Sequence, residues 1–237
     1  MRTIEHGAHL VQLSWYGVIN AYLVRESDGL TLVDAGLPGT APEIVAAARG
    51  LDLPITRILL THAHLDHAGA LDGLRLQLPD ARLFVARREA RLLLGDRTPD
   101  IGEPTQRPRG IFPRLATLAD RLVDSGDRVG SLIMIPSPGH TPGHVAWLDT
   151  RDRTLLAGDA FVMTGGLAVA GVMRAWFPFP TLSTWHRPWA LESARALTAL
   201  RPTRLAVGHG AVLDAPHGAM QRALLEAEGH PDFAIAA

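Results

Sequence analysis

The segment Ile58-Leu59-Leu60-Thr61-His62-Ala63-His64-Leu65-Asp66-His67 joins two different kinds of sequence within ten residues. Its first part is a short apolar run rich in branched residues, which predicts a buried strand. Its second part places three histidines and one aspartate within six residues, and these side chains are metal ligands. A solvated polar loop would have a similar composition, but polar groups directly after a buried strand usually serve a site. We therefore predict a strand that leads into a metal-binding loop.

Elsewhere in the chain, other polar side chains also come directly after apolar runs. They are Asp34, His140, Asp159 and His209, each accompanied by glycine or proline. Because residues from the ends of several strands can converge at the rim of a sheet, we expect these side chains to meet the histidine loop. The six remaining histidines are interpreted as surface or hydrogen-bonded residues, with His144 the least certain because it lies four residues after His140.

The alternation of apolar runs with turn residues predicts an α/β fold. Strands are expected at 9–13, 18–24, 30–33, 58–60, 81–86, 132–135, 145–148, 154–157 and 205–207. Helices are expected at 40–49, 67–78, 87–94, 188–200 and 218–228. The strands come in two groups that are each followed by helices, which predicts two sheets with helices outside. No linker or fixed-period repeat interrupts the chain, so residues 1–237 are expected to form a single domain.

Composition excludes several classes of protein. The chain has 237 residues, 47% hydrophobic and 20% charged, with a net charge of −1 and arginine as its only basic residue apart from histidine. There is no basic stretch of the kind that binds nucleic acid. Cysteine is absent, so any metal must bind nitrogen and oxygen. No apolar leader or membrane-length run occurs, which favours a cytoplasmic protein with no membrane partner; a homodimer is left open.

The pattern His62-x-His64-x-Asp66-His67, with Asp34 before it and His140, Asp159 and His209 after it, resembles the metallo-β-lactamase superfamily of metal-dependent hydrolases. The resemblance implies a four-layer αββα sandwich with a dinuclear metal site at the edge between the sheets. It further implies two groups of ligands joined by a bridging Asp159, with Asp34 behind them. The implied groups are His62, His64 and His140 for one metal, and Asp66, His67 and His209 for the other.

The chemistry of such a site indicates a hydrolase. Imidazole and carboxylate ligands without sulfur suit zinc, and also iron or manganese. Two divalent ions lower the pKa of a bridging water, so that hydroxide is available at neutral pH. In the family that the chain resembles, Asp66 faces this nucleophile and could act as the catalytic proton carrier. We therefore expect hydrolysis of a small-molecule substrate, with an ester or lactone favoured.

Comparison within the superfamily leaves the substrate open. Only 28 residues follow His209, which is too few for the helical domain of glyoxalase II. N-acyl homoserine lactonases match in size, but they usually carry a tyrosine where this chain has Val162. His186 is a conceivable replacement for that tyrosine. The alternatives are an iron-dependent oxidative member such as a persulfide dioxygenase, a thioesterase or phosphodiesterase of the same fold, and a non-catalytic binding member.

Two segments are candidates for the walls of a substrate pocket. Residues 95–114 are rich in proline and glycine, and they predict either a lid or a disordered loop. Residues 161–180 follow Asp159 and carry large apolar side chains without helical spacing, although ordinary core packing would explain them equally well. The predicted pocket residues are Met173, Trp176, Phe177 and Phe179, together with His186.

Overall fold

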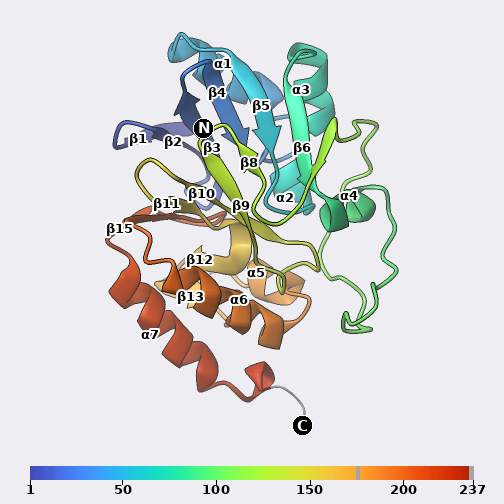
Figure 1. Ribbon diagram of the computed structural model, residues 1–237, viewed down its shortest axis with the longest axis vertical. Coiled ribbons are helices and arrows are strands. Elements are labelled where there is room, and N and C mark those ends of the chain that lie inside the picture. Colours follow the sequence, from blue (N-terminus) through green and yellow to red (C-terminus); the bar gives the residue numbers. More distant parts are fainter. Residues whose placement is uncertain (175–176, 235–237) are drawn as a thin grey trace.

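Two β-sheets stacked face to face form the centre of the computed structural model, which describes residues 1–174 and 177–234 (Figure 1). The first sheet has seven strands in chain order, antiparallel from β1 to β4 and parallel from β4 to β7. These strands are β1 (Arg2–His6), β2 (Leu10–Trp15), β3 (Ile19–Glu26), β4 (Gly29–Val33), β5 (Ile55–Leu59), β6 (Arg82–Ala86) and β7 (Arg121–Val123).

The second sheet has six strands in the order β15-β14-β11-β10-β9-β8, and only the β11–β14 pair is parallel. Its strands are β8 (Arg128–Val129), β9 (Leu132–Pro136), β10 (Val145–Asp149), β11 (Thr154–Leu156), β14 (Arg204–Ala206) and β15 (Leu213–Asp214). A separate hairpin of β12 (Phe161–Met163) and β13 (Leu167–Val169) follows β11.

Helices cover the outer faces of both sheets. Helices α1 (Ala41–Gly50) and α3 (Leu71–Gln77) share an apolar layer with the first sheet. Helices α6 (Arg187–Ala199) and α7 (His217–Glu228) share another with the second sheet. The shorter helices are α2 (Leu65–Ala68), α4 (Arg87–Leu93) and α5 (Phe179–Ser183), with 3-10 turns at Gly158–Ala160 and Pro231–Phe233. The predicted four-layer αββα sandwich is confirmed.

Alternation of side chains along the strands produces these layers. In β10, Val145 and Trp147 point into the layer between the two sheets, whereas Ala146 and Leu148 point toward α6 and α7. In β4, Val33 enters the layer between the sheets and Leu32 enters the one beneath α1. Because apolar residues occupy both faces of these strands, each sheet is buried on both sides.

Several details differ from the sequence-based prediction. The single helix expected at 67–78 is divided into α2 and α3. The division falls at Gly69, where a Cβ atom would lie 2.3 Å from the Leu65 carbonyl oxygen and 2.5 Å from Pro38 Cδ. The predicted loop 161–180 starts with the β12–β13 hairpin, which Phe161 and Val169 anchor in the core. No helix within the described residues is long and apolar enough to cross a membrane.

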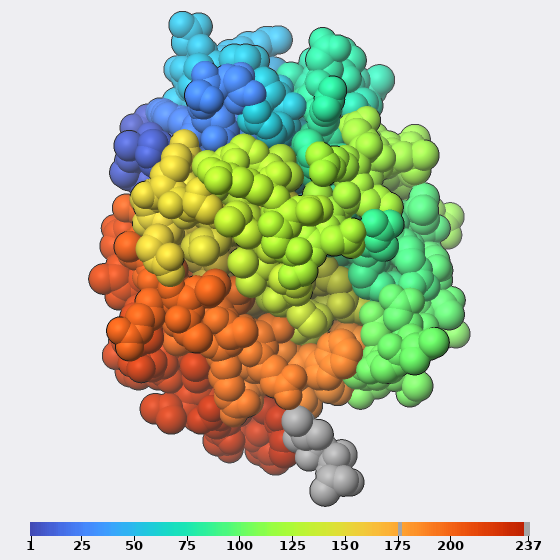
Figure 2. All heavy atoms as spheres, viewed as in Figure 1, coloured from blue at the N-terminus to red at the C-terminus, as the bar shows by residue number. Residues whose placement is uncertain are grey.

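The segment 95–114 has no helix or strand, yet side-chain and backbone contacts tie it to the rest of the molecule. It runs along one edge of the surface next to α4 (green in Figures 1 and 2). Arg88 of α4 pairs with Glu103 at 2.8 Å, and the indole nitrogen of Trp185 donates to the carbonyl of Gln106 at 2.7 Å. Leu65 N donates to the carbonyl of Ile111 at 2.8 Å. The segment is therefore held at several points between its ends.

Candidate metal centre

The histidine loop leaves the end of β5 and enters α2 at the rim of the sandwich, next to the start of β10. The histidine loop is joined to β10 by a hydrogen bond in which the Val145 amide donates to the Thr61 carbonyl at 2.9 Å. The side chains of His62, His64 and His67 are buried, whereas that of Asp66 is 29% exposed. Three imidazoles are therefore removed from bulk water at the point where the two sheets meet.

The structure brings all seven predicted ligands together from four places in the chain. Three overlapping groups have their ligand atoms within 4.8 Å of one another. These groups are His62, His64 and His140; His62, His67 and Asp159; and Asp66, His67 and His209. Asp159 touches both sides of the cluster, since its carboxylate lies 3.3 Å from His140 Nε2 and 3.3 Å from His67 Nε2.

Distances between the ligand atoms fit a bound cation. His64 Nδ1 lies 3.1 Å from His62 Nε2 and 3.0 Å from His140 Nε2. His209 Nε2 lies 3.0 Å from Asp159 Oδ2 and 3.4 Å from Asp66 Oδ2. In a tetrahedral site with bonds of 2.0–2.1 Å, two ligand atoms are separated by about 3.4 Å. The spacing is therefore close to that of ligands around one small divalent ion.

Two polar atoms at the centre of the cluster provide an independent test of this fit. His67 Nε2 and Asp159 Oδ1 are buried and lie 3.3 Å apart, and neither makes a well-aligned hydrogen bond with any described residue. An unpaired polar atom in a protein interior is costly, and such atoms are rare. A divalent cation would accept electron pairs from both atoms, so the donor set present here fits a metal.

Asp34 fixes one side of the cluster, as expected from its position after β4. It occupies a left-handed conformation (φ 64°), which aspartate tolerates better than most residues. Its carboxylate accepts hydrogen bonds at 2.8 Å from Thr61 N, Thr61 Oγ1 and His67 Nδ1. His67 is therefore oriented with Nε2 toward the cluster, the usual task of a carboxylate behind a metal-binding imidazole.

The other imidazoles are oriented in the same way, each through the nitrogen that faces away from the cluster. The Thr61 hydroxyl donates to Asp34 and thus accepts from His62 Nδ1, at 3.0 Å. Thr184 donates to the Pro180 carbonyl and thus accepts from His140 Nδ1, at 3.1 Å. The partners of the last two imidazoles are backbone carbonyls: Arg109 O at 2.8 Å from His64 Nε2, and Val18 O at 2.9 Å from His209 Nδ1.

His144 was interpreted from the sequence as a surface or hydrogen-bonded histidine, and it is buried beside the cluster. Its Nε2 accepts a hydrogen bond from Asp159 N at 3.1 Å, so its proton lies on Nδ1 and is donated to Ser137 Oγ at 2.9 Å. Burial lowers the pKa of His144 to about 3, which keeps this ring neutral. His144 therefore positions the backbone of Asp159, and its spacing of four residues from His140 was the only signal in the sequence.

Burial and charge divide the cluster into two electrostatic halves. Burial lowers the pKa values of His62, His64 and His140, which leaves these imidazoles in the neutral form that binds metals. Burial also opposes a charge on His67 and His209, but Asp159 and the neighbouring carboxylates outweigh it and raise both pKa values. The half that contains the carboxylates therefore attracts positive charge, as a cation site requires.

A cavity of about 290 Å³ opens onto the cluster. Its walls consist mostly of apolar side chains from several loops, together with Ser183 and the ligands His64, Asp66, His140, Asp159 and His209. The apolar residues are Ile19, Leu37, Leu65, Ile111, Phe177, Phe179 and Pro180. The two candidate wall segments thus both contribute, 95–114 through Ile111 and 161–180 through Phe177, Phe179 and Pro180.

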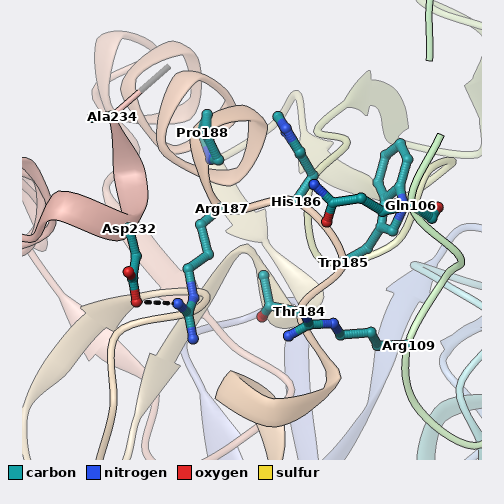
Figure 3. Close-up of a pocket in the computed structure, with 9 residues that line it drawn as sticks. All are labelled: Gln106, Arg109, Thr184, Trp185, His186, Arg187, Pro188, Asp232 and Ala234. Atoms are coloured by element: carbon teal, nitrogen blue, oxygen red, sulfur yellow. Dashed lines mark hydrogen bonds and ion pairs between the residues drawn. The ribbon is translucent and has the colours of Figure 1, made fainter. Parts of the chain in front are cut away.

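Other predicted pocket residues lie elsewhere. Met173 is 51% exposed and does not line the described part of this cavity, and Trp176 falls outside the described residues. His186 lines a second, more polar cavity of about 410 Å³ with Arg109, Thr184 and Arg187 (Figure 3). Its Nδ1 accepts a hydrogen bond from Trp189 N, which makes His186 the N-cap of α6. His186 is not among the described residues that line the cavity over the cluster.

Comparisons with known proteins agree with this geometry. The sequence model of the metallo-beta-lactamase superfamily matches residues 15–209, and the chain belongs to this family of metal-dependent enzymes. It is 44% identical over 211 residues to the uncharacterized protein YobT of Bacillus subtilis (strain 168), covering 89% of this chain and 91% of the relative.

The chain is also similar to a probable metallo-hydrolase of the same bacterium, YflN, with 29% identity over 81% of each chain. Among solved structures, TTHA1623 in a di-iron-bound form superimposes with a TM-score of 0.64 and 27% identity, covering 90% of this chain and 97% of that one. The family, the relatives and the cluster of ligands together indicate a metallo-hydrolase.

Proposed function

We propose that the protein is a dinuclear metal-dependent hydrolase of small, neutral esters or lactones. The observation that carries the substrate class is the composition of the cavity over the cluster. Apart from the metal-ligand residues, Ser183 is the one polar side chain among the described residues that line it, and no arginine does so. A substrate without negative charge suits such a pocket, because an anionic group would be desolvated there without a partner.

The ligand groups support two ions. His62, His64 and His140 would hold one, Asp66, His67 and His209 the other, and the two oxygens of Asp159 face both sides. When bound, the ions supply the activated water and the Lewis acid of a hydrolase. Zinc suits this donor set, and the di-iron form of TTHA1623 makes iron the principal alternative.

Asp66 is placed to move a proton. Both Asp66 and Asp159 line the cavity, but the Asp66 side chain is 29% exposed, whereas that of Asp159 is buried between three imidazoles. The His209, His67 and His140 rings outweigh burial and hold the pKa of Asp159 well below its usual range, so that this carboxylate stays ionised. We therefore assign proton transfer to the leaving group to Asp66, and a purely ligating role to Asp159.

Ser183 is the neutral hydrogen-bond donor that this cavity offers a substrate. It is the last residue of α5, directly before the Thr184 that orients His140. Its hydroxyl makes no hydrogen bond to another described residue, so it is available to a ligand. A carbonyl or ring oxygen of an ester could accept from it, which would fill the place of the tyrosine found in lactonases.

Metal analysis and a substrate screen together test the proposal. Protein loaded with zinc or with iron should hold two ions per chain, and it should cleave lactones or aryl esters faster than thioesters and phosphodiesters. One ion per chain with oxygen consumption on a persulfide would indicate the oxidative alternative. Preference for a thioester or a phosphodiester would be consistent with the proposed metal site but would contradict the proposed ester or lactone substrate.

A further inference from the structure

Glu89 is a buried carboxylate that lies between two ligand-bearing loops without touching a ligand side chain. It belongs to α4 and is 1% exposed. Its Oε2 accepts a hydrogen bond from Ala63 N at 2.7 Å. Its Oε1 accepts from the Thr141 hydroxyl at 2.6 Å and from Gly143 N at 2.9 Å. One side chain thereby joins the segment between His62 and His64 to the segment that follows His140.

Burying the charged Glu89 carboxylate costs the folded protein free energy. Burial raises the pKa of Glu89 to about 7 against three hydrogen bonds that lower it. Its neighbour Arg88 does not neutralise it directly, because the Arg88 guanidinium pairs with Glu103 at 2.8 Å. An apolar residue, such as the buried Leu92 one turn further along α4, would avoid burying a charge but would leave Ala63 N, Gly143 N and the Thr141 hydroxyl without this acceptor. The carboxylate therefore contributes hydrogen-bond acceptors that an apolar side chain cannot provide.

The contacts of Glu89 indicate that contribution. Ala63 separates His62 from His64, and Thr141 directly follows His140, so the three imidazoles of one ligand group are attached to backbone that Glu89 holds. The other ligand group depends on different partners, since Asp34 orients His67 and the Val18 carbonyl orients His209. Glu89 therefore holds the backbone of the first group, whereas Asp34 orients His67 of the second group and, through Thr61, also His62.

We infer that Glu89 is a positioning residue that sets the distance between the two histidine loops and thereby the affinity of the His62, His64 and His140 group for its metal. This inference rests on the proposed metal site. The relevant distances are short, with His64 Nδ1 3.1 Å from His62 Nε2 and 3.0 Å from His140 Nε2. A displacement of one loop relative to the other by a few tenths of an ångström would spoil this spacing for a small cation.

The test compares Glu89→Gln and Glu89→Asp with the wild type. Glutamine has one acceptor oxygen and an amino group, so it cannot accept from all three donors; aspartate keeps the charge but is one methylene shorter. Each purified protein is loaded with Zn²⁺, titrated with a competing chelator, and separately loaded with Co²⁺ for its visible absorption spectrum. Both variants should lose tenfold or more in affinity for one metal, with a changed cobalt spectrum.

Asp149→Asn is the matched control. Asp149 is also a buried carboxylate with several hydrogen bonds, from Ser131, Arg151 N and the Arg151 guanidinium. It lies at the far end of β10 from the histidine loop. This control should lower the unfolding temperature as much as the Glu89 variants do while retaining the wild-type chelator titration and cobalt spectrum.

The outcomes separate this inference from the proposed function. Wild-type protein with fewer than two metals would refute the dinuclear proposal, and the affinity for the remaining metal would still be compared between variants. Wild-type metal affinity in Glu89→Gln or Glu89→Asp would overturn the positioning role. The same affinity loss in Asp149→Asn, or loss of the fold in both Glu89 variants, would also overturn it and make Glu89 a general structural residue.

Discussion

Asp34 and Glu89 hold the histidine loop through backbone amides that are only two residues apart. Asp34 Oδ1 accepts from Thr61 N at 2.8 Å, and Glu89 Oε2 accepts from Ala63 N at 2.7 Å. The first carboxylate follows β4 in the first sheet, and the second belongs to α4. Each carboxylate also accepts a hydrogen bond from a second segment: Asp34 from the His67 ring, and Glu89 from the hydroxyl of Thr141, the residue after His140. Two buried carboxylates thus anchor the same histidine loop and connect it to different neighbouring segments.

The variant Asp34→Asn should weaken the ligand group of Asp66, His67 and His209. Asparagine tolerates the left-handed backbone as well as aspartate does, so the chain path should be retained. Its amide cannot accept from the Thr61 amide, the Thr61 hydroxyl and His67 Nδ1 together. Chelator titration should show a 10- to 100-fold loss of affinity for one metal. Two metals bound with wild-type affinity would contradict this role.

The sequence was sufficient to predict the layers of the fold and the seven residues that converge, because both depend on strong local patterns. Apolar runs predict strands, and a polar residue after each run predicts a common rim. Glu89 had no such signal, since a glutamate among the arginines of a short helix resembles a solvated one. Its partners Ala63 and Thr141 are 26 and 52 residues away along the chain.

The segment 95–114 shows a second limit of sequence reasoning. Its prolines and glycines predicted a lid or a disordered loop, but its backbone supports the site through Arg109 O, which accepts from His64 Nε2. The strands β7, β8 and β15 were not predicted, because two or three residues carry too little alternation to be recognised. In both cases, tertiary contacts rather than local pattern decide the conformation.

Gly110→Ala tests whether this segment positions His64. A Cβ at Gly110 would lie 2.3 Å from His64 Nε2, so the imidazole or the loop must move. We expect a loss of tenfold or more in metal affinity and in catalytic rate. Gly102→Ala is the matched control, because Gly102 has nearly the same φ (88° against 89°) and nothing within 4 Å of the added atom. If the two variants had equal effects, strain from the positive φ would explain both of them, and the contact with His64 would have no role.

Asp66→Asn should separate proton transfer from metal binding. The amide cannot take a proton at neutral pH, so kcat should fall by about 100-fold or more in protein that still holds metal. Asp72→Asn should leave kcat unchanged, because Asp72 lies in the neighbouring α3 and its carboxylate accepts hydrogen bonds from Ala116 N and Thr117 N, which are not part of the cluster. Turnover at the wild-type rate in metal-loaded Asp66→Asn would remove Asp66 from the mechanism.

The raised pKa of Glu89 predicts a specific dependence of stability on pH. Burial raises this pKa from 4.5 to about 7, so the folded protein binds more protons than the unfolded chain between these values. The stability associated with this group is present below pH 4.5 and is lost as pH rises through about 7, at up to about 1.4 kcal/mol per pH unit.

In the variant Glu89→Gln the side chain at this position cannot titrate. The difference in unfolding free energy between wild type and variant therefore gives the pH-dependent contribution of Glu89. Free energies of unfolding of the metal-free wild type and variant are measured by urea denaturation between pH 5 and pH 9. The wild type should lose stability relative to the variant as pH rises, and the difference should level off above pH 8. Parallel pH profiles would show that Glu89 does not change its protonation in this range.

The apolar cavity predicts selectivity for longer acyl groups. The ring centroid of Phe177 lies 5.0 Å from that of His209, and Phe179 and Ile111 line the same cavity. Each methylene buried against these side chains should contribute up to about 0.8 kcal/mol, which corresponds to roughly a fourfold gain in kcat/KM. The gain should end when the chain reaches solvent beyond the cavity.

A homologous series of esters or lactones measures this slope in the wild type and in two variants. Phe177→Ala should flatten the rise of kcat/KM with chain length while metal content stays constant, because it removes wall area next to the ligands. Leu182→Ala is the matched control, since Leu182 is 57% exposed in the adjacent α5 and lies outside the described cavity lining. A wild-type series without length dependence, or equal slopes in both variants, would show that the substrate does not occupy this wall.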